Sequence, residues 1–278
     1  MGNLRAAILG CGYVGRAVAT LWQQQGLIVT ATTTQPEHLK DLVNVADRVL
    51  VMRGNDGAAV AELLAGQQVL LICVGAGRQA NYEETYLNTA KTVVNALAQA
   101  PDLQQIIFTS TYSIYGNYGG AWVRENDPAQ PTTDNGKIML DTEQVLLSAV
   151  TEQRRVCIFR LGGIYGPGRE LAKIYGRTAG TTRQGTGQEA SNWIHLEDIV
   201  GAIDWAQCHE LSGLYNLVQD EIPTVRDLLD RVCQAHHLVP VQWDATQPSA
   251  RPYNVRVSNQ KLKAAGYTFR HPTFGALP

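Results

Sequence analysis

Six residues near the start of the chain have the types and spacing of a phosphate-binding turn. Residues 10–15 read Gly-Cys-Gly-Tyr-Val-Gly, the pattern G-x-G-x-x-G, between an apolar run and an amphipathic stretch. Gly10 permits the tight turn, Gly12 lets the backbone approach a pyrophosphate, and Gly15 lets the following helix pack closely. Free N–H groups at the start of that helix favour an anion. We expect a dinucleotide to contact Gly10, Gly12, Tyr13, Val14 and Gly15; the alternative is a tight turn without a ligand.

The second apolar run ends in residues that would meet the adenosine ribose of a dinucleotide. Residues 30–34 read Thr-Ala-Thr-Thr-Thr, whereas NAD sites usually carry an acidic residue about 20 residues after the glycine turn. A 2′-phosphate is therefore not repelled, and hydroxyls that could bond it belong to Thr32, Thr33 and Thr34. Because the nearest basic residue is Arg16, NADP is only slightly favoured over NAD. Val74 and Gly75, after a later apolar run, are the other expected cofactor contacts.

Three tyrosines follow the apolar run at residues 105–109, namely Tyr112, Tyr115 and Tyr118. Doubly wound sheets bind ligands where such strands end, so one of these phenols could move a proton. The alternative is that they are structural, since tyrosine offers an apolar body with a polar tip. Tyr112 is our catalytic candidate, and Tyr115 is an expected substrate contact.

Arginines gather after the last apolar run of the first half, at Arg160, Arg169, Arg177 and Arg183. Guanidinium groups suit a carboxylate or phosphate on a substrate. Arg177 and Arg183 lie in a stretch rich in Gly and Thr, and we expect them to contact substrate; the alternative is that both are merely solvated.

The five cysteines are widely spaced and mostly apolar in context, which favours reduced thiols in the cytoplasm over a disulfide framework. Cys11 lies beside the predicted helix start, where a thiol pKa can fall, although a small inert residue fits this tight turn better. Residues 233–237, Cys-Gln-Ala-His-His, superficially suggest a metal, but no second cluster accompanies them. We expect no metal.

Short apolar runs alternate with helical patterns through the first half of the chain. Strands are predicted at residues 6–9, 27–30, 48–52, 69–74, 105–109 and 156–160, and helices at 14–25, 58–65, 83–99 and 140–152. Continuous apolar strands joined by helices indicate a doubly wound parallel α/β sheet, the Rossmann fold. Residues 1–160 would form an NAD(P)-binding domain. Residues 161–278, with shorter elements at 194–207, 213–217, 225–236 and 258–265, would mainly form a small C-terminal substrate-binding region.

Composition narrows the function classes. Apolar residues make up 45% of the 278 residues and charged residues 17%, so the chain is typical of a folded protein. A formal net charge of -2 without basic blocks argues against nucleic-acid binding. The longest apolar runs fall far short of the roughly 20 residues that span a bilayer. We expect a small-molecule substrate, no nucleic-acid or membrane partner, and we leave a homodimer open.

Further motifs add to the glycine turn. They are Tyr-Leu-Asn-Thr at 86–89, Phe-Thr-Ser-Thr-Tyr-Ser-Ile-Tyr-Gly at 108–116, Arg-Leu-Gly-Gly-Ile-Tyr-Gly-Pro-Gly at 160–168 and Trp-Ile-His-Leu-Glu-Asp at 193–198. In this order and spacing the chain resembles the extended and atypical short-chain dehydrogenases/reductases, the NAD-dependent epimerase/dehydratase family. The resemblance covers nearly the whole chain. It implies that Thr111 bonds the reacting oxygen of a substrate and that His195 and Asp198 position the substrate region and anchor the C-terminal part. His195 is an expected substrate contact; the alternative is a structural histidine.

The catalytic Tyr-x-x-x-Lys pair of that family is missing. In the family the two residues lie one helical turn apart, so that the ammonium lowers the pKa of the phenol. None of the lysines has a tyrosine four positions before it. The alignment we prefer, anchored on Glu143, puts Asn135 in the tyrosine position and Met139 in the lysine position. An alignment anchored on Lys137 instead puts Thr133 in the tyrosine position and Asp141 in the acid position, leaving a lysine that could hold a ribose but no phenol to move a proton.

Residues 131–137, Pro-Thr-Thr-Asp-Asn-Gly-Lys, followed by an acid-containing helix, are similar to a bacterial atypical subgroup, the YeeZ-like proteins. The resemblance implies hydride transfer on a small polar, sugar- or nucleotide-like substrate by an oxidoreductase or an epimerase/dehydratase. The catalytic candidates are Thr111, Tyr112 and Asn135. A rival hypothesis is an NAD(P)-binding scaffold or redox-sensing regulator that has lost catalysis, in which Met139 and other side chains would fill the reaction space.

Overall fold

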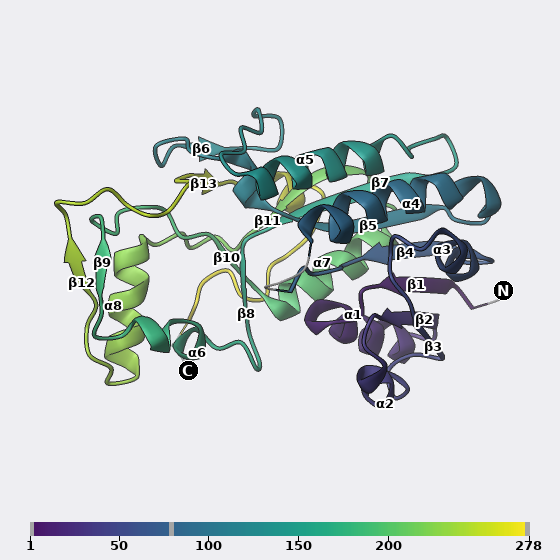
Figure 1. Cartoon of the computed structure of the whole chain (residues 1–278), viewed down its shortest axis with the longest axis horizontal. Coiled ribbons are helices and arrows are strands. Elements are labelled where there is room, and N and C mark those ends of the chain that lie inside the picture. Colours follow the sequence, from purple (N-terminus) through teal and green to yellow (C-terminus); the bar gives the residue numbers. More distant parts are fainter. Residues whose placement is uncertain (1–2, 78–80, 276–278) are drawn as a thin grey trace. The chain divides into compact units, whose positions relative to one another are not determined.

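The computed structural model describes residues 3–77 and 81–275 and divides into two compact units (Figure 1). Unit 1 comprises Met1–Ser110, Lys137–Phe159 and Val200–Leu214, and unit 2 comprises Thr111–Gly136, Arg160–Ile199 and Tyr215–Pro278. A contiguous division at residue 160 therefore differs from the observed units, because each unit is assembled from segments far apart in the sequence.

A seven-stranded sheet forms the centre of the fold, in the order β11-β7-β5-β4-β1-β2-β3. Its strands are β1 (Arg5–Leu9), β2 (Ile28–Thr33), β3 (Arg48–Val51), β4 (Val69–Ile72), β5 (Gln105–Thr111), β7 (Arg155–Leu161) and β11 (Gly213–Leu217). β1 pairs in parallel with β2 and β4, as β2 does with β3 and β4 with β5. All four residues of β4 are buried, as expected for a strand covered on both faces. The doubly wound Rossmann class predicted from the sequence is confirmed.

Helices flank this sheet (Figure 1). They are α1 (Tyr13–Gln24), α2 (Leu39–Leu42), α3 (Gly57–Leu64), α4 (Thr89–Ala96), α5 (Asp134–Leu147) and α7 (Leu196–Cys208). The end of α1 meets α7, where the Gln25 amide donates to the Asp204 carboxylate at 3.1 Å. Within the described ranges, no helix combines the length and apolarity needed to cross a bilayer.

Two predicted helices have different boundaries in the structure. α5 begins at Asp134 and not near residue 140, because the Thr133 hydroxyl accepts the N–H of Gly136 at 3.1 Å and thereby caps the first turn. Asn-Gly at 135–136 looks like a turn in the sequence, which hid this start. The helix predicted at 83–99 is a π-helical turn (Glu84–Asn88), then α4, then a 3-10 turn (Leu97–Gln99).

Short elements build most of unit 2. Three two-stranded parallel ribbons pair β6 (Trp122–Val123) with β13 (Arg256–Val257), β8 (Gly163–Tyr165) with β10 (Trp193–His195), and β9 (Thr182–Gln184) with β12 (Gln242–Asp244). The helices are α6 (Leu171–Tyr175), α8 (Val225–Ala235) and α9 (Gln260–Ala264), with a 3-10 turn at Tyr112–Tyr115. Strands of two or three residues are too short to show an alternation of apolar and polar residues, so the sequence did not reveal them. The run 213–217, expected in the C-terminal region, is instead edge strand β11 of the central sheet.

Candidate functional site

The glycine turn of unit 1 joins β1 to α1, and its glycines have different surroundings. Gly10 has φ +93°, and a Cβ there would lie 2.7 Å from the Val74 backbone. A Cβ on Gly15 would lie 2.8 Å from the Cys73 sulfur. A Cβ on Gly12 would meet nothing within 4 Å. The protein itself therefore requires Gly10 and Gly15, whereas Gly12 leaves open the space that a pyrophosphate needs to approach the N-terminus of α1. The turn thus fits a dinucleotide.

The threonines at the end of β2 divide into structural and accessible positions. Thr32 is 2% exposed, its hydroxyl accepts the N–H of Gly10 at 2.9 Å, and its carbonyl accepts the N–H of Cys11 at 2.8 Å. Thr32 therefore holds the glycine turn against β2 and does not face a 2′-phosphate. Thr33 accepts the N–H of Gln35 at 3.1 Å, and Thr34 is exposed. Of the three, Thr34 is the residue best placed to meet a ligand.

Cys11 lies within the glycine turn, and Val74, after β4, lies beside it. Burial raises the pKa of the Cys11 thiol to about 11, so this thiol is protonated and unreactive at neutral pH. After β4, Val74 is half-buried and Gly75 is exposed. The next residue, Ala76, donates its N–H to the Tyr86 hydroxyl at 3.2 Å. Tyr86 lies in the π-helical turn, a distortion common at functional sites, and here it fixes the loop that carries the predicted cofactor contacts.

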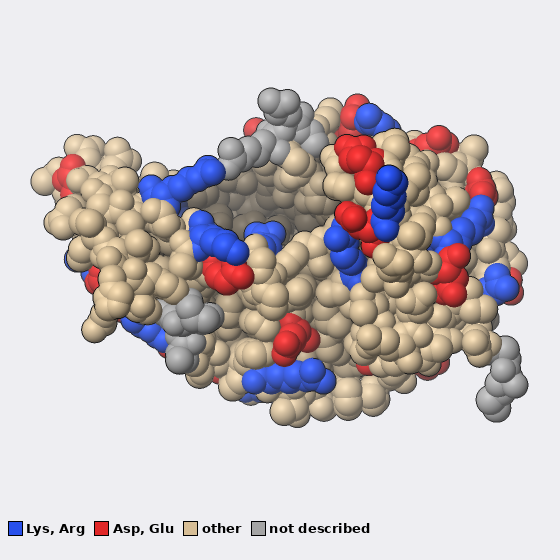
Figure 2. Space-filling view, turned by 90° about the horizontal axis from the view of Figure 1, so that it is seen from below, with Lys and Arg blue, Asp and Glu red and all other residues tan. Residues whose placement is uncertain are grey.

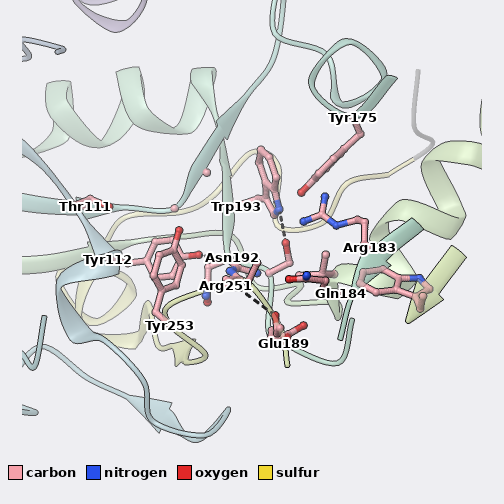
Figure 3. A pocket seen from close by; sticks show the side chains of 17 residues that line it. Thr111, Tyr112, Tyr175, Arg183, Gln184, Glu189, Asn192, Trp193, Arg251 and Tyr253 are labelled. Atoms are coloured by element: carbon pink, nitrogen blue, oxygen red, sulfur yellow. Dashed lines mark hydrogen bonds between the residues drawn. The ribbon is translucent and has the colours of Figure 1, made fainter. Parts of the chain in front are cut away.

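Unit 2 contains a cavity of about 630 Å³. It is lined by segments from six parts of this unit: Thr111 and Tyr112, Gly162 and Gly163, Tyr175, residues 183–193, Val225, and residues 243–253. Tyr112 and Tyr253 lie at one end of the cavity and Arg183 and Tyr175 at the other, with Trp193 between them (Figure 3). Aromatic walls with a few charged groups are typical of small-molecule sites.

Each end of the cavity has one guanidinium packed on an aromatic ring. The Arg183 guanidinium lies 5.9 Å from the Trp243 ring centre, and that of Arg251 lies 4.9 Å from the Tyr253 ring centre. Arg251 also donates to the Tyr112 hydroxyl at 2.6 Å. Glu189 contributes a carboxylate to the lining. Two fixed cations on aromatic walls suit an anionic ligand that has a flat or apolar part.

The cavity brings together three of the residues singled out in the sequence. Thr111, at the end of β5, and Tyr112 lie at one end, and Arg183 lies at the other. Burial raises the pKa of the Tyr112 phenol above its ordinary value, while the Arg251 charge opposes this rise. Arg177 is exposed in a 3-10 turn, outside the residues that line the cavity.

Tyr115, expected to touch substrate, lies in the core of unit 2. It is 0% exposed, and its hydroxyl donates to the Asn216 side-chain oxygen at 2.8 Å. The Arg160 guanidinium covers its ring at 4.8 Å. In this position Tyr115 supports the structure of unit 2 and does not reach the cavity, because its ring points into a cluster that includes Val123 and Val257.

In the alignment anchored on Glu143, the positions of the family's catalytic pair carry neither a phenol nor a cation. Asn135 is exposed in the first turn of α5, and Met139, one turn later, is 2% exposed. Glu143, which anchors that alignment, is buried and accepts the Ser110 hydroxyl at 2.5 Å. These positions offer no acid/base chemistry comparable to the Tyr–Lys pair.

His195 and Asp198 have mainly structural contacts. The His195 Nδ1 accepts the N–H of Glu197 at 3.2 Å and so caps α7. Asp198 accepts the backbone N–H groups of Arg270 and His271 at 2.7 and 2.9 Å, which anchors the C-terminal segment. Burial lowers the pKa of His195, and the nearby His271 lowers it further.

His195, Glu197 and His271 are close enough to suggest a metal, their ligand atoms lying within 4.8 Å of one another. However, Nδ1 of His195 already accepts a hydrogen bond, so the neutral ring carries its proton on Nε2 and presents no lone pair. The His271 Nε2 meets the Glu197 carboxylate at 2.9 Å. The cluster is therefore explained by capping and pairing. The sequence run 233–237 is not part of it; Cys233 is buried against the Val239 carbonyl.

Several cavity residues escaped sequence reasoning, above all Asn192, Trp243, Arg251 and Tyr253. Arg251 is 139 residues from its partner Tyr112, and no spacing rule connects them. The sequence offers one local signal for Arg251 and Tyr253: they flank Pro252 in a stretch without helical or strand periodicity.

Charged side chains are dispersed on the face shown in Figure 2. Several lysine or arginine side chains lie around the hollow in this face, and side chains of both signs are mixed over the part to the right of it.

Comparison with known proteins agrees with the fold. The chain is 27% identical over 287 residues to Protein YeeZ of Escherichia coli (strain K12), across 99% of this chain and 98% of that protein. Its fold is similar to that of MoeE5 solved with UDP-glucose and NAD, with a TM-score of 0.80, 17% identity, and 99% and 96% of the two chains covered. The UDP-glucose 4-epimerase of Thermus thermophilus, solved with NAD, gives a TM-score of 0.80, 18% identity and the same coverage, 99% and 96%. A sequence model of the NAD dependent epimerase/dehydratase family matches residues 6–217, and the chain therefore belongs to that family.

Proposed function

We propose that this protein is an NAD(P)-dependent oxidoreductase or epimerase that transfers hydride on a small anionic sugar derivative, with a nucleoside diphosphate sugar as the leading substrate class. The observation that carries this proposal is the cavity of unit 2, where Arg183 and Arg251 each lie against an aromatic ring. Guanidinium groups match the geometry of phosphate, and aromatic rings match a base or a sugar face.

The relatives with known ligands support this substrate class. MoeE5 was solved with UDP-glucose and NAD, and the similar epimerase from Thermus thermophilus acts on UDP-glucose. A diphosphate would place its negative charge near the guanidinium groups. The sugar could lie at either end of the cavity. We place it at the end that contains Tyr112, because Thr111, the proposed partner of the reacting oxygen, lies there.

Within the proposed site, Thr111 binds the reacting oxygen. Its hydroxyl lies 3.0 Å from that of Ser113 and accepts the Ser113 N–H at 3.3 Å, so its orientation is fixed. When bound, the nicotinamide cofactor supplies or accepts the hydride. Gly10, Gly12 and Gly15 hold its pyrophosphate, while residues 74–75 lie next to the turn.

Cofactor choice is proposed to depend on the end of β2. The family is NAD-dependent, yet the exposed Thr34 carries no charge that would repel a 2′-phosphate. Arg16 lies in α1 with its guanidinium 3.5 Å from Asp41, both half-exposed, so this cation is shared with a carboxylate. We infer that NAD and NADP both bind, with a small preference for NADP.

The rival hypothesis of a scaffold without catalysis expects Met139 and its neighbours to fill the reaction space. Met139 is buried within unit 1, whereas the cavity is formed by residues of unit 2. An open cavity with charged and hydroxyl groups supports an enzyme. A cytoplasmic setting is also proposed, supported by the five free cysteines, and a homodimer stays a prediction.

The test is an assay of the purified protein with NAD⁺ or NADP⁺ and a panel of UDP- and dTDP-sugars. A reductase or dehydrogenase changes absorbance at the nicotinamide band, whereas an epimerase interconverts sugars, visible by NMR, without net cofactor turnover. Turnover of at least one sugar nucleotide is expected. No turnover and no binding of any panel member would contradict the proposed substrate class.

A further inference from the structure

The family's Tyr-x-x-x-Lys pair is absent from α5, but the cavity contains a phenol in contact with a permanent cation. The Tyr112 hydroxyl accepts a hydrogen bond from Nη2 of Arg251 at 2.6 Å. Tyr112 is 5% exposed, and both residues line the cavity. Figure 3 shows the Tyr112 ring beside Tyr253, with Arg251 next to both.

The guanidinium of Arg251 is held from two sides. Its central carbon lies 4.9 Å from the Tyr253 ring centre, and the Tyr253 ring meets that of Tyr112 edge-on at 5.5 Å between centres. A planar guanidinium fixed by stacking and a hydrogen bond loses little further freedom when it acts. Arg251 is therefore a preorganised donor to one oxygen atom.

The direction of this hydrogen bond leaves the Tyr112 proton available for transfer. Arginine has no acceptor, so the Tyr112 oxygen is the acceptor and its own proton is directed elsewhere. If that proton leaves, the resulting phenolate stays beside a positive charge that cannot be neutralised by deprotonation near neutral pH. As in a Tyr–Lys pair, a cation adjoins the phenolic oxygen; here burial still raises the pKa of Tyr112, and Arg251 opposes that rise.

We propose that Tyr112 is the proton-transfer residue of this site and that Arg251 is its positioning residue, together replacing the missing Tyr–Lys pair. In reduction of a carbonyl, the O–H bond of Tyr112 breaks as its proton passes to the substrate oxygen, and the phenolate left behind stays beside Arg251. In oxidation of an alcohol, the Tyr112 phenolate takes the O–H proton as the C=O bond forms. A bound nicotinamide would supply the hydride to the carbon in the first direction and would accept it in the second. This inference rests on the proposed function for its substrate and hydride partner.

The next two tyrosines along the chain, Tyr115 and Tyr118, lack this arrangement. The Tyr115 hydroxyl donates to Asn216 in the core, and the Tyr118 hydroxyl donates to the Pro128 carbonyl at 2.7 Å. Both protons are engaged by protein acceptors. Tyr118 lies outside the cavity lining and makes Tyr118→Phe a matched control.

The first test measures ionisation without any turnover. A fluorinated tyrosine, whose phenol ionises nearer neutral pH, is incorporated at position 112, and its absorbance is titrated in the full chain. In Arg251→Gln the pKa of this phenol should rise by about one unit or more, which is a tenfold fall in its ionisation constant. Arg251→Lys should reverse part of that rise. An unchanged midpoint in Arg251→Gln would overturn the pairing.

The second test uses the sugar nucleotide that turns over in the assay above. Tyr112→Phe should lower kcat about 100-fold or more with little change in KM, and should flatten the pH dependence of kcat; Tyr118→Phe should match the wild type. Wild-type kcat in Tyr112→Phe would overturn the catalytic role even if the titration supports the pairing. If no sugar nucleotide turns over, the proposed function and the catalytic role both fail, while the titration still decides the pairing.

Discussion

The glycine turn of unit 1 and the cavity of unit 2 are built in opposite ways. The turn is a contiguous run of residues 10–15 in which each glycine has a definable reason to be glycine. The cavity is assembled from segments between Thr111 and Tyr253, and its closest polar contact joins residues 139 apart. A site formed by the backbone of one contiguous motif can therefore be predicted from the sequence. A site formed by side chains that are far apart in the sequence can be identified only once the fold is known.

The largest effect is expected at the turn. Gly12→Val places a branched side chain in the open space beside the N-terminus of α1 and should weaken NAD(P) binding about 100-fold or more, roughly 2.7 kcal/mol. Calorimetric titration measures this. Gly57→Val is the control, because a Cβ at Gly57 also meets nothing within 4 Å. Equal affinities in Gly12→Val and wild type would remove the assignment of the turn.

The next largest effect tests whether the cavity binds a sugar nucleotide independently of cofactor binding at the glycine turn. Arg183→Gln removes a charged donor at one end of the cavity and should weaken binding of UDP-glucose about 10- to 100-fold, since hydrogen bonds to charged groups contribute roughly 1.5–3 kcal/mol. Affinity for NAD(P) should stay unchanged. Arg177→Gln, at an exposed arginine outside the lining, is the matched control. Similar losses in both variants would argue for general electrostatic attraction.

Tyr115→Phe tests whether the first tyrosine after Tyr112 is structural. It leaves the buried Asn216 oxygen without its donor and should reduce the free energy of unfolding by about 1–3 kcal/mol. Urea denaturation measures the change, and ligand affinities at the cavity should remain those of the wild type. A stable Tyr115→Phe protein with impaired sugar-nucleotide binding would instead support the substrate contact expected from the sequence.

The smallest effect concerns cofactor choice. Thr34→Glu introduces a carboxylate at the exposed end of β2 and should weaken NADP about fivefold more than NAD, because like charges near a surface cost on the order of 1 kcal/mol. Thr34→Gln controls for size. Equal losses for both cofactors would remove the support for an NADP preference.

The strands of the central sheet were largely predictable, because continuous apolar runs such as Val69–Ile72 reflect burial on both faces. The ribbons of unit 2 were not, since strands of two or three residues have no readable period. Tyr112 was identified from its place after an apolar run, Arg183 from its stretch rich in Gly and Thr, and Thr111 from the family resemblance; the structure puts all three at the cavity.

The remaining site residues depend on long-range packing. Tyr112 and Tyr115 are three positions apart in one 3-10 turn and belong to the same buried cluster, yet only Tyr112 also lines the cavity. Thr32 likewise has the right chemistry for a phosphate but is engaged by Gly10. Residue type indicated what these side chains could do, and only their neighbours determined which of them is available.

Hydrogen–deuterium exchange of the full chain, measured with NAD⁺ or NADP⁺ alone and with UDP-glucose alone, tests the division between the two regions most directly. The account predicts that the dinucleotide slows exchange in peptides covering residues 10–15, and that the sugar nucleotide slows it in peptides covering residues 183–193 and 249–253. Absence of protection at the glycine turn with either dinucleotide, or protection of that turn by UDP-glucose in place of the cavity segments, would contradict it.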